Sequence, residues 1–212
     1  MNPTKSIKGI ALALTTGVAY LALNSTALAA DSTNKGFLAF DGGVSYSQST
    51  TFHGADGNSR VSFDSGLRFD IRGGVEPESG LGFDLDLGVI YCPLKQNPLL
   101  VEGGSLDLYE IPMMVDLTYT LPRFGPFRAY LGGGIGGVYG VWTGNGTSLF
   151  GFTTDITFGY QGTAGIKYQI NDRCDLGVAY RFLGTTGHDL GSGISMDGTL
   201  THSFMAVVNF KF

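Results

Sequence analysis

Acidic and basic side chains recur at every second position in several parts of this chain. Arg68, Asp70 and Arg72 are spaced two residues apart, and so are Asp84 and Asp86. On a β-strand, residues with this spacing lie on one face, roughly 7 Å apart. Neighbouring carboxylates on one face could bind a cation, whereas carboxylates beside arginines form ion pairs. We favour ion pairs, because buried charges persist only when they are paired.

Histidine and serine residues could supply a base and a nucleophile, but their spacing argues against this role. His202 and Ser203 are adjacent, so on one strand they point to opposite faces and cannot form a hydrogen-bonded pair. His53 and His188 fall in predicted loops. Because spacing brings no nucleophile and base together, we predict no enzyme, no catalytic residue and no metal site.

A glycine-rich stretch matches the dinucleotide-binding fingerprint, but its context does not fit. Gly132, Gly134 and Gly137 satisfy G-x-G-x-x-G. That motif requires a helix after the last glycine, with its N-terminus facing the pyrophosphate. Here Val138 and Tyr139 continue a strand pattern. We therefore predict no cofactor, and expect inward glycines to make room for bulky charged neighbours.

The residues above lie in segments whose hydrophobicity alternates with a period of two, as in β-strands. In residues 61–75 the odd positions include Phe63 and Phe69, whereas the even positions include Asp64 and Arg68. Pro112 removes a backbone donor from one such segment, where we expect a local bulge. The predicted strands cover residues 37–47, 61–75, 81–91, 109–119, 127–142, 155–170, 175–183 and 200–212.

The connections between these eight segments alternate in length. Those after the second, fourth and sixth strands are short, whereas those after the first, third, fifth and seventh are longer, polar and rich in glycine. The longer ones cover about residues 47–60, 92–105, 143–154 and 184–198. An even number of antiparallel strands with short turns at one end and long loops at the other is typical of an outer-membrane barrel.

The composition agrees with a barrel and excludes other classes. The chain of 212 residues holds 34 glycines and is 12% aromatic but only 15% charged, which favours many strands with tight turns over a soluble helical domain. The net charge of −5, with no basic cluster, argues against a nucleic-acid partner.

The size of the interior predicts which face of the barrel points outward. Eight strands leave an interior just wide enough for side chains, which rings such as Phe63, Phe69, Phe83, Phe158 and Tyr168 would overfill. The predicted fold is therefore all-β, an eight-stranded antiparallel transmembrane β-barrel of meander topology, with apolar residues toward lipid. Five tyrosines near strand ends fit aromatic girdles at the membrane surfaces: Tyr46, Tyr91, Tyr109, Tyr119 and Tyr168.

The charged face then lines the lumen, where acids and bases are present in similar numbers. We predict an ion-pair network that fills the lumen. Its acids are Asp41, Asp64, Asp70, Asp84, Asp86, Glu110, Asp116 and Asp175, and its bases are Arg68, Arg72, Arg128, Lys167, Arg181 and Lys211.

The N-terminal segment has the pattern of a secretory signal peptide. Lys5 and Lys8 precede an apolar run over residues 10–23, and Ala27 and Ala29 occupy the small positions of a cleavage site. A membrane anchor is the weaker alternative, because the run is too short to span a bilayer. We expect residues 1–29 to be the signal peptide and residues 30–212 to form the barrel.

The two cysteines fall at opposite ends of the predicted barrel. Cys92 ends the third strand at the long-loop end, and Cys174 lies in a short turn. The hydrocarbon core is about 30 Å thick, whereas bridged cysteines need Cα atoms within roughly 7 Å. We predict that they do not form an intramolecular disulfide.

The last strand ends on alternating apolar residues, which are Phe204, Ala206, Val208, Phe210 and Phe212. This ending resembles the assembly signal of bacterial outer-membrane proteins. Together with "LYEIPMMVDLTY", "AYLGGGIGG", "TAGIKYQI" and "LGVAYRFL", it makes residues 36–212 similar to the eight-stranded OmpA- and opacity-like outer-membrane β-barrel family. The resemblance implies a location in the outer membrane of a Gram-negative bacterium.

The resemblance also sets expectations for partners and function. We expect contacts with outer-membrane lipids, with periplasmic chaperones and the barrel-assembly machinery during biogenesis, and with an extracellular partner of the loops. A monomer with a structural or surface-interaction role is the leading hypothesis. A small pore for ions or small solutes is the first alternative, and an enzyme that modifies lipid A is the second.

Overall fold

The computed structural model describes residues 34–54, 57–95, 105–145, 152–191 and 194–212. The predicted signal peptide lies outside this part of the chain. The eight longest strands are β1 (Asn34–Ser47), β4 (Ser65–Pro77), β5 (Leu81–Pro93), β6 (Ser105–Thr120), β7 (Phe127–Asn145), β8 (Phe152–Asn171), β9 (Cys174–Thr185) and β12 (Leu200–Lys211). The described residues contain no helix long and apolar enough to cross a membrane.

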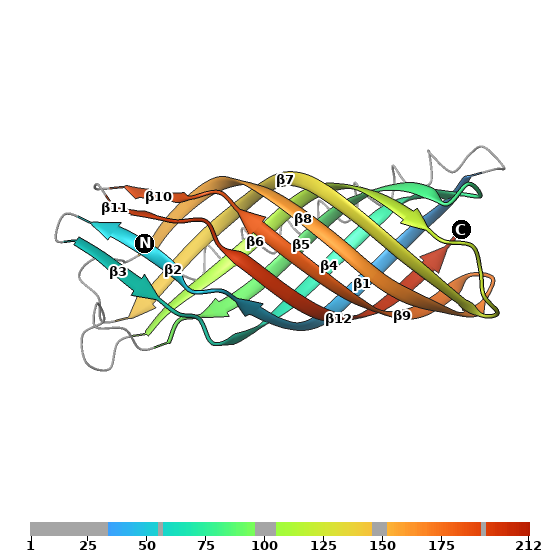
Figure 1. Ribbon diagram of the computed structural model, residues 1–212, viewed down its shortest axis with the longest axis horizontal. Helices are drawn as coiled ribbons and strands as arrows, with labels where there is room; N and C mark the ends of the chain where they lie inside the picture. Colours follow the sequence, from blue (N-terminus) through green and yellow to red (C-terminus); the bar gives the residue numbers. More distant parts are fainter. Residues whose placement is uncertain (1–33, 55–56, 96–104, 146–151, 192–193) are drawn as a thin grey trace.

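These eight strands form a closed antiparallel barrel in the order β1-β12-β9-β8-β7-β6-β5-β4, as Figure 1 shows. The barrel closes where β1 pairs with β4 on one side and with β12 on the other. Three short turns join β4 to β5, β6 to β7 and β8 to β9 at one end, which we call the short-turn end. Gly80 and Gly125 have positive φ in two of these turns, a conformation that favours glycine. The eight-stranded meander predicted from the sequence is confirmed.

The side chains of each barrel strand alternate between a buried inner face and an exposed outer face, as a pleated strand requires. On β4, for example, Arg68 is 0% exposed and Phe69 is 60% exposed. Ile135 and Val178 are 60% and 64% exposed on the same outer surface. The outer face of the barrel is thus apolar and the inner face charged, which is the orientation predicted for a barrel that spans a membrane.

The prediction that residues 61–75 form one strand is wrong at its beginning. The chain leaves the barrel strand at residues 62–64, and the alternation changes phase there: Val61 and Phe63 are buried, whereas from Gly66 onward the even positions are buried. A slip of one residue exchanges the two faces of a strand. Phe63 therefore points inward, where it forms an isolated bridge with Leu94, and does not face lipid.

Two of the predicted loops contain a second, four-stranded antiparallel sheet. Its strands β2 (Thr50–Gly54), β3 (Gly57–Val61), β10 (His188–Gly191) and β11 (Ile194–Met196) are arranged in the order β10-β11-β2-β3. The sheet extends from the end of the barrel opposite the short turns, on the left in Figure 1. These strands were not predicted, because residues 47–60 and 184–198 have the polar, glycine-rich sequence of loops. We call this sheet the outer sheet.

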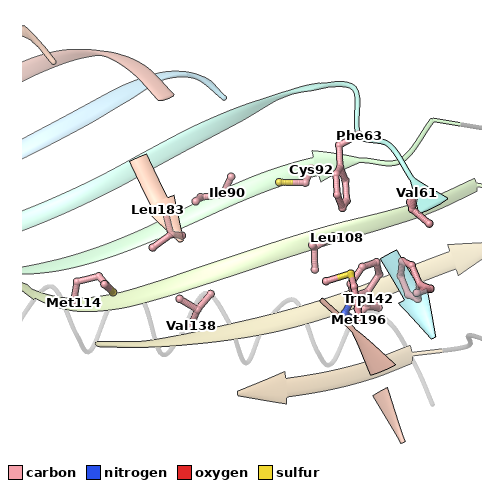
Figure 2. Packing of buried hydrophobic residues seen from close by; sticks show 11 residues of the cluster. Val61, Phe63, Ile90, Cys92, Leu108, Met114, Val138, Trp142, Leu183 and Met196 are labelled. Atoms are coloured by element: carbon pink, nitrogen blue, oxygen red, sulfur yellow. The ribbon is translucent and has the colours of Figure 1, made fainter. Parts of the chain in front are cut away.

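A buried apolar cluster joins the outer sheet to the barrel interior, as Figure 2 shows. Trp142 of β7 is fully buried, and its ring meets that of Phe52 in β2 with centroids 5.5 Å apart. Side chains of the barrel wall and of the outer sheet thus share one core, which fixes the sheet on the barrel. The apolar cluster consists of Phe52, Val61, Phe63, Ile90, Cys92, Leu108, Met114, Val138, Trp142, Leu183 and Met196.

Pro112 lies within β6, but the bulge expected there is absent. The pairing of β5 with β6 keeps one register from Leu87↔Met113 to Ile90↔Glu110, and the two residue pairs between them are missing from the ladder. The missing donor of proline therefore interrupts the β5–β6 ladder locally without an inserted residue.

Both cysteines are free, in agreement with the topological argument. Cys92 is 2% exposed within the apolar cluster, and its Sγ lies 3.2 Å from Ser47 Oγ. Cys174 begins β9 at the short-turn end.

Candidate functional site

The candidate site is a group of buried charged side chains and one glutamine that meet across the middle of the barrel. They come from β1, β4, β5, β6, β8 and β9, and all have residue exposures of 5% or less. We call this group the central charge cluster, and it comprises Asp41, Arg68, Asp70, Arg72, Asp84, Asp86, Asp116, Gln161 and Arg181.

Arg181 lies at the centre of this cluster and contacts three carboxylates from three strands. Its Nη1 donates to Asp86 Oδ2 at 2.7 Å and to Asp70, and its Nη2 donates to Asp41 Oδ2 at 3.1 Å. Because guanidinium presents several donors in one plane, a single arginine can bridge carboxylates from opposite walls. Arg181 therefore fastens β9 to β1, β4 and β5 across the lumen.

The other two arginines bind mainly one aspartate each. Arg72 Nε donates to Asp41 Oδ2 at 2.7 Å, and Arg68 Nε donates to Asp70 Oδ2 at 2.8 Å. Arg68 Nη2 also donates to Gln161 Oε1 at 3.0 Å. Charge-assisted contacts of this kind are the strong class of hydrogen bond, so these side chains hold fixed positions.

The central charge cluster contains more acids than bases, with five aspartates and three arginines. Gln161 binds two of the aspartates, because its Nε2 lies 2.8 Å from Asp86 Oδ2 and 2.7 Å from Asp116 Oδ2. Asp84 has no hydrogen-bond partner for either oxygen among the described residues, and Arg72 Nη1 lies 3.9 Å away. Two carboxylates are thus left without a matching cation, and Asp84 is the least satisfied.

A second set of charges lies near the short-turn end. Glu76 accepts from Arg128 at 3.1 Å and from Lys167 at 3.2 Å, and Lys211 donates to Asp175 at 2.7 Å. Arg128 Nη2 also lies 3.5 Å from Asp175 Oδ2. Three of these residues, Glu76, Arg128 and Lys211, line a cavity of about 520 Å³ at the short-turn end, together with Phe37 and others.

Inward glycines give the carboxylates their space. A Cβ on Gly134 would lie 2.0 Å from Asp116 Oδ1, and a Cβ on Gly88 would lie 2.2 Å from Asp70 Oδ1. Any larger residue would displace these aspartates from the cluster. Gly137 of the G-x-G-x-x-G stretch differs, because its Cβ would meet no atom within 4 Å, so it makes no room in the lumen.

Above the central charge cluster, a line of polar side chains leads toward the outer sheet. His188 Nδ1 lies 3.0 Å from Asp155 Oδ2, and its Nε2 lies 3.4 Å from Thr185 Oγ1. Thr185 Oγ1 lies 2.9 Å from Thr199 Oγ1, which donates to Glu110 Oε1 at 2.9 Å. Burial lowers the pKa of His188, and the Asp155 carboxylate opposes that shift.

An acid, a histidine and a hydroxyl group in this order resemble the catalytic residues of a hydrolase. Here, however, both the histidine and the hydroxyl group are buried. His188 is 1% exposed and Thr185 is 6% exposed. A nucleophilic hydroxyl must reach a substrate carbonyl, and here Thr185 Oγ1 is instead occupied by Thr199. The arrangement can hold and pass a proton rather than attack a substrate.

The outer sheet carries a second histidine, His53, whose side chain is 41% exposed. Its Nε2 lies 3.0 Å from Asp197 Oδ1, and its Nδ1 lies 3.0 Å from Asn58 Oδ1. The hydrogen bond to Asp197 raises the pKa of His53. This contact links β2 to the residue that follows β11.

His202 and Ser203 point to opposite faces, as their adjacency requires. The His202 ring lies on the outer face, where its Nδ1 lies 2.6 Å from Tyr180 Oη and its Nε2 lies 3.2 Å from Gln48 Nε2. Ser203 is 0% exposed inside the barrel. The two side chains do not form a nucleophile–base pair.

One predicted member of the lumenal network, Asp64, is wrongly placed by sequence analysis. Asp64 lies in the irregular residues 62–64, is exposed, and pairs with Lys95 at 3.4 Å. The cause is the change of phase described above, which removes this residue from the inner face. Glu110 does lie inside, but its partner is the Thr199 hydroxyl and not a basic side chain. The structure places Asp70, Asp84, Asp86, Asp116, Arg68, Arg72, Arg128, Lys167, Arg181 and Lys211 inside the barrel.

Several residues of the buried polar contacts were not predicted from the sequence, among them Glu76, Gln161 and His188. Glu76 was assigned to a short turn, Gln161 was not counted among the charged positions, and His188 was assigned to a loop. The alternation of β4 and β8 gives a signal for two of them, because Glu76 and Gln161 share the inward phase of Arg72 and Lys167. No local pattern identifies His188, since its partners lie on other strands.

The apolar residues predicted to form one row on the last strand lie on its outer face. Phe204, Phe210 and Phe212 are 57%, 44% and 51% exposed on the outer face. β12 pairs with β1 and β9, and the Phe212 amide donates to the Gly36 carbonyl at 3.0 Å. The final residue is therefore part of the seam at which the barrel closes.

Comparison with solved structures shows the same fold. Neisserial surface protein A matches with 15% identity and a TM-score of 0.52, covering 84% of this chain and 97% of that one. OprG from Pseudomonas aeruginosa matches with 17% identity and a TM-score of 0.52, covering 84% and 96%. The outer membrane protease OmpT from Escherichia coli matches with 9% identity and a TM-score of 0.53, covering 84% and 97%. No curated protein matches the chain significantly.

Residues 16–212 match the family described as the outer membrane protein beta-barrel domain. This match covers most of the chain, and it agrees with the closed barrel, the apolar outer face and the outer-membrane barrels of similar fold. The chain therefore belongs to the outer membrane protein β-barrel family, and the protein resides in the outer membrane of a Gram-negative bacterium.

Proposed function

We propose that this protein is a barrel with a blocked lumen, and that it presents an ordered sheet outside the cell for interaction with an external partner. The observation that carries the proposal is the apolar cluster that joins Phe52 and Met196 of the outer sheet to Trp142 of the barrel wall. With the short turns in the periplasm, the outer sheet lies on the extracellular side. A surface held by a buried core keeps one shape, which lowers the cost of binding.

The side chains that fill the lumen support a barrel that does not conduct ions. The central charge cluster crosses the interior from wall to wall through Arg181. The apolar cluster fills the interior nearer the outer sheet. Ions would have to break buried ion pairs and then pass an apolar region, and both steps are costly.

The exposed part of the outer sheet is polar and is suited to a reversible contact. Asn58 and Arg60 are exposed on β3, and Ser195 is exposed on β11. Such side chains carry hydrogen-bond donors and acceptors. Because loops on a rigid scaffold tolerate change, this is the part of the protein in which a partner-specific surface would be built.

A small pore for cations is the second candidate function. The observation that favours it is the excess of two carboxylates in the central charge cluster, in which Asp84 accepts no hydrogen bond from the described residues. Rings of acidic side chains select cations in channels. A third candidate, modification of lipid A, is not supported by the positions of His202 and Ser203.

The proposal includes the partners expected during and after assembly. We propose that periplasmic chaperones deliver the unfolded chain to the barrel-assembly machinery. This machinery is proposed to recognise the apolar row of β12, which ends at Phe212. The apolar outer face is proposed to contact membrane lipids around a monomer, because a closed barrel leaves no unpaired edge strand.

Two measurements on the refolded protein test the proposed function. Planar-bilayer recording should show no steady conductance, and a stable cation-selective current would favour the pore. In parallel, cells that display the protein should bind immobilised extracellular-matrix proteins or glycans. That binding should be lost when residues 51–60 are replaced by a short turn, and kept when residues 122–125 of a periplasmic turn are replaced. Equal binding by both variants would contradict the proposal.

A further inference from the structure

A continuous line of hydrogen bonds connects the outer sheet with the barrel interior. It begins at Asp155 of β8, passes through His188 of β10, and continues through Thr185 and Thr199 to Glu110 of β6. The four donor–acceptor distances are 3.0, 3.4, 2.9 and 2.9 Å. Two ionisable groups that the proposed function does not use are therefore joined through two hydroxyl groups.

The hydroxyl groups of Thr185 and Thr199 can form all of these hydrogen bonds with the donors pointing in either direction along the line. In the first arrangement His188 Nε2–H donates to Thr185, Thr185 donates to Thr199, and Thr199 donates to a Glu110 carboxylate. In the reverse arrangement a protonated Glu110 donates to Thr199, Thr199 donates to Thr185, and Thr185 donates to Nε2 of a neutral His188. The Thr199 amide donates to Thr185 Oγ1 at 2.9 Å in both, and Nδ1–H faces Asp155 in both.

The two arrangements differ by the position of one proton. Conversion of the first into the second moves a proton from His188 to Thr185, one from Thr185 to Thr199, and one from Thr199 to Glu110. Imidazolium and carboxylate become neutral imidazole and carboxylic acid, with no bond to carbon changed. Hydroxyl groups with both a donor and an acceptor neighbour can pass protons in this way.

The surroundings of Glu110 give it a reason to accept a proton. Its Oε2 has no hydrogen-bond partner among the described residues, and its side chain is 1% exposed. A buried charged group with an unsatisfied oxygen is costly. The other ionisable groups whose charges act on it are Arg68 from β4, which already pairs with Asp70, and the thiol of Cys92 from β5.

Within the described part of the chain, one charged side chain forms an ion pair with His188. Asp155 of β8 is that partner, at 3.0 Å. From β7 the nearest position is Gly140, where a Cβ would lie 3.7 Å from ring atoms of His188, and from β11 the paired residue is Met196. Asp189 follows His188 on β10 and is exposed. The imidazole therefore exchanges protons with the line itself or with Asp155.

We propose that His188 and Glu110 form a single proton-binding site in which one proton is shared through Thr185 and Thr199. The site lies where β10 of the outer sheet meets β8 of the barrel wall, so it links the outer sheet to the barrel interior. Uptake of a proton adds one positive charge at this junction. The proposal does not depend on the identity of an extracellular partner.

The test is the titration of the histidine rings by NMR in lipid nanodiscs, with isotope-labelled histidine. The chain contains three histidines, so the ring signals of His53 and His202 serve as internal references. When two groups are coupled by more than about one pH unit, they titrate in two steps that belong to the pair. His188 in the wild-type protein should therefore show two steps, whereas His53 should show one.

Glu110→Gln should reduce the titration of His188 to a single step, because glutamine cannot take up the proton. Thr199→Val should do the same while it retains Glu110, since valine keeps the shape but removes the hydroxyl. Thr163→Val is the matched control, because Thr163 is a buried lumenal threonine outside the line, and two steps should remain. Heat-modifiable gel migration checks that each variant folds.

Three results would overturn the proposal. The first is a single step for His188 in the wild-type protein, which needs no variant. The second is two unchanged steps in both Glu110→Gln and Thr199→Val. The third is a second step that persists in Glu110→Gln and disappears in Asp155→Asn, which would assign the coupling to Asp155 alone.

Discussion

At the scale of single residues, the environment of a charge decides what it contributes. Arg181 and Lys95 both contact aspartates, but Arg181 is 1% exposed in its side chain, whereas the Lys95 and Asp64 side chains are 57% and 55% exposed. Exposed pairs contribute about 0–1 kcal/mol, while loss of one partner of a buried pair costs about 3–5 kcal/mol. The same ion-pair chemistry therefore has different effects in the lumen and on the loops.

Replacement of Arg181 tests this difference. Arg181→Met keeps a long side chain but leaves Asp41, Asp70 and Asp86 without their shared cation, so the free energy of unfolding should fall by about 3–5 kcal/mol. Lys95→Met is the matched control and should change it by about 1 kcal/mol or less. Urea titration of the refolded barrel in lipid vesicles measures both. Equal midpoints for the two variants would contradict the ion-pair assignment.

His53 predicts a pH dependence of the outer sheet. The hydrogen bond to Asp197 raises the pKa of His53 above its ordinary value of 6.5. The folded state thus holds the proton more tightly than the unfolded state. The stabilisation is fully present below about pH 6.5 and is lost as the pH rises through the folded-state pKa.

His53→Gln should remove this dependence. The difference in unfolding midpoint between wild type and variant should be small but present at pH 6, and should vanish above the raised pKa. Hydrogen exchange of the β2 and β11 amides as a function of pH gives a local measure. A difference that grows as the pH rises would show that the sign is wrong.

At the scale of elements, each barrel strand separates two environments. On β4 the Arg68 side chain is buried and charged, and Phe69 is 60% exposed on the apolar outer face. Adjacent residues on the strand therefore lie in different environments, one among buried ion pairs and the next on the apolar outer face. The same alternation places Phe204, Phe210 and Phe212 in one outward row on the closing strand.

Substitutions at Phe69 test the orientation of the strand. Phe69→Leu should be tolerated, because leucine remains apolar toward lipid. Phe69→Arg should lower the free energy of unfolding by about 2–4 kcal/mol if the position lies near the middle of the membrane. Unfolding in vesicles distinguishes the two variants. Equal stability of both would mean that this face does not contact lipid.

The closing strand predicts an effect on assembly. Deletion of Phe212 removes the end of the apolar row and its amide bond to the Gly36 carbonyl, so insertion into the outer membrane should be impaired. Phe212→Tyr is the control and should insert, because it keeps an aromatic ring. The fraction of heat-modifiable protein in outer-membrane preparations is the measurement. Normal insertion of the deleted chain would argue against an assembly signal at this residue.

At the scale of the whole molecule, the barrel and the outer sheet form one folded unit. The apolar cluster is continuous from Ile90 and Leu183 in the barrel to Phe52 and Met196 in the outer sheet. The segments that form the outer sheet were predicted from the sequence to be loops. A shared core means that the extracellular end should resist reagents that would reach a flexible loop.

Cysteine labelling tests this closure. Its position at the loop end of a strand would by itself let an impermeant maleimide reach Cys92 from outside the cell. Its burial among Phe63, Leu108 and Trp142 instead predicts no labelling on intact cells. The Ser195→Cys variant, with its new thiol on the exposed side of β11, is the positive control. If Cys92 were labelled as rapidly as the thiol introduced by Ser195→Cys, the apolar cluster would have to open readily.

The sequence by itself determined the number of barrel strands, their order and the face that each presents. These features follow from period-two alternation and from turn lengths, which are local properties of the chain. The tertiary structure decided which charges meet, because Arg181 contacts Asp70 and Asp86 across the lumen, 111 and 95 residues away in the chain. It also decided the change of phase at residues 62–64, the outer sheet and the line from His188 to Glu110. Each of these depends on which strands, far apart in the chain, come together when the barrel closes. A local sequence pattern does not specify these contacts.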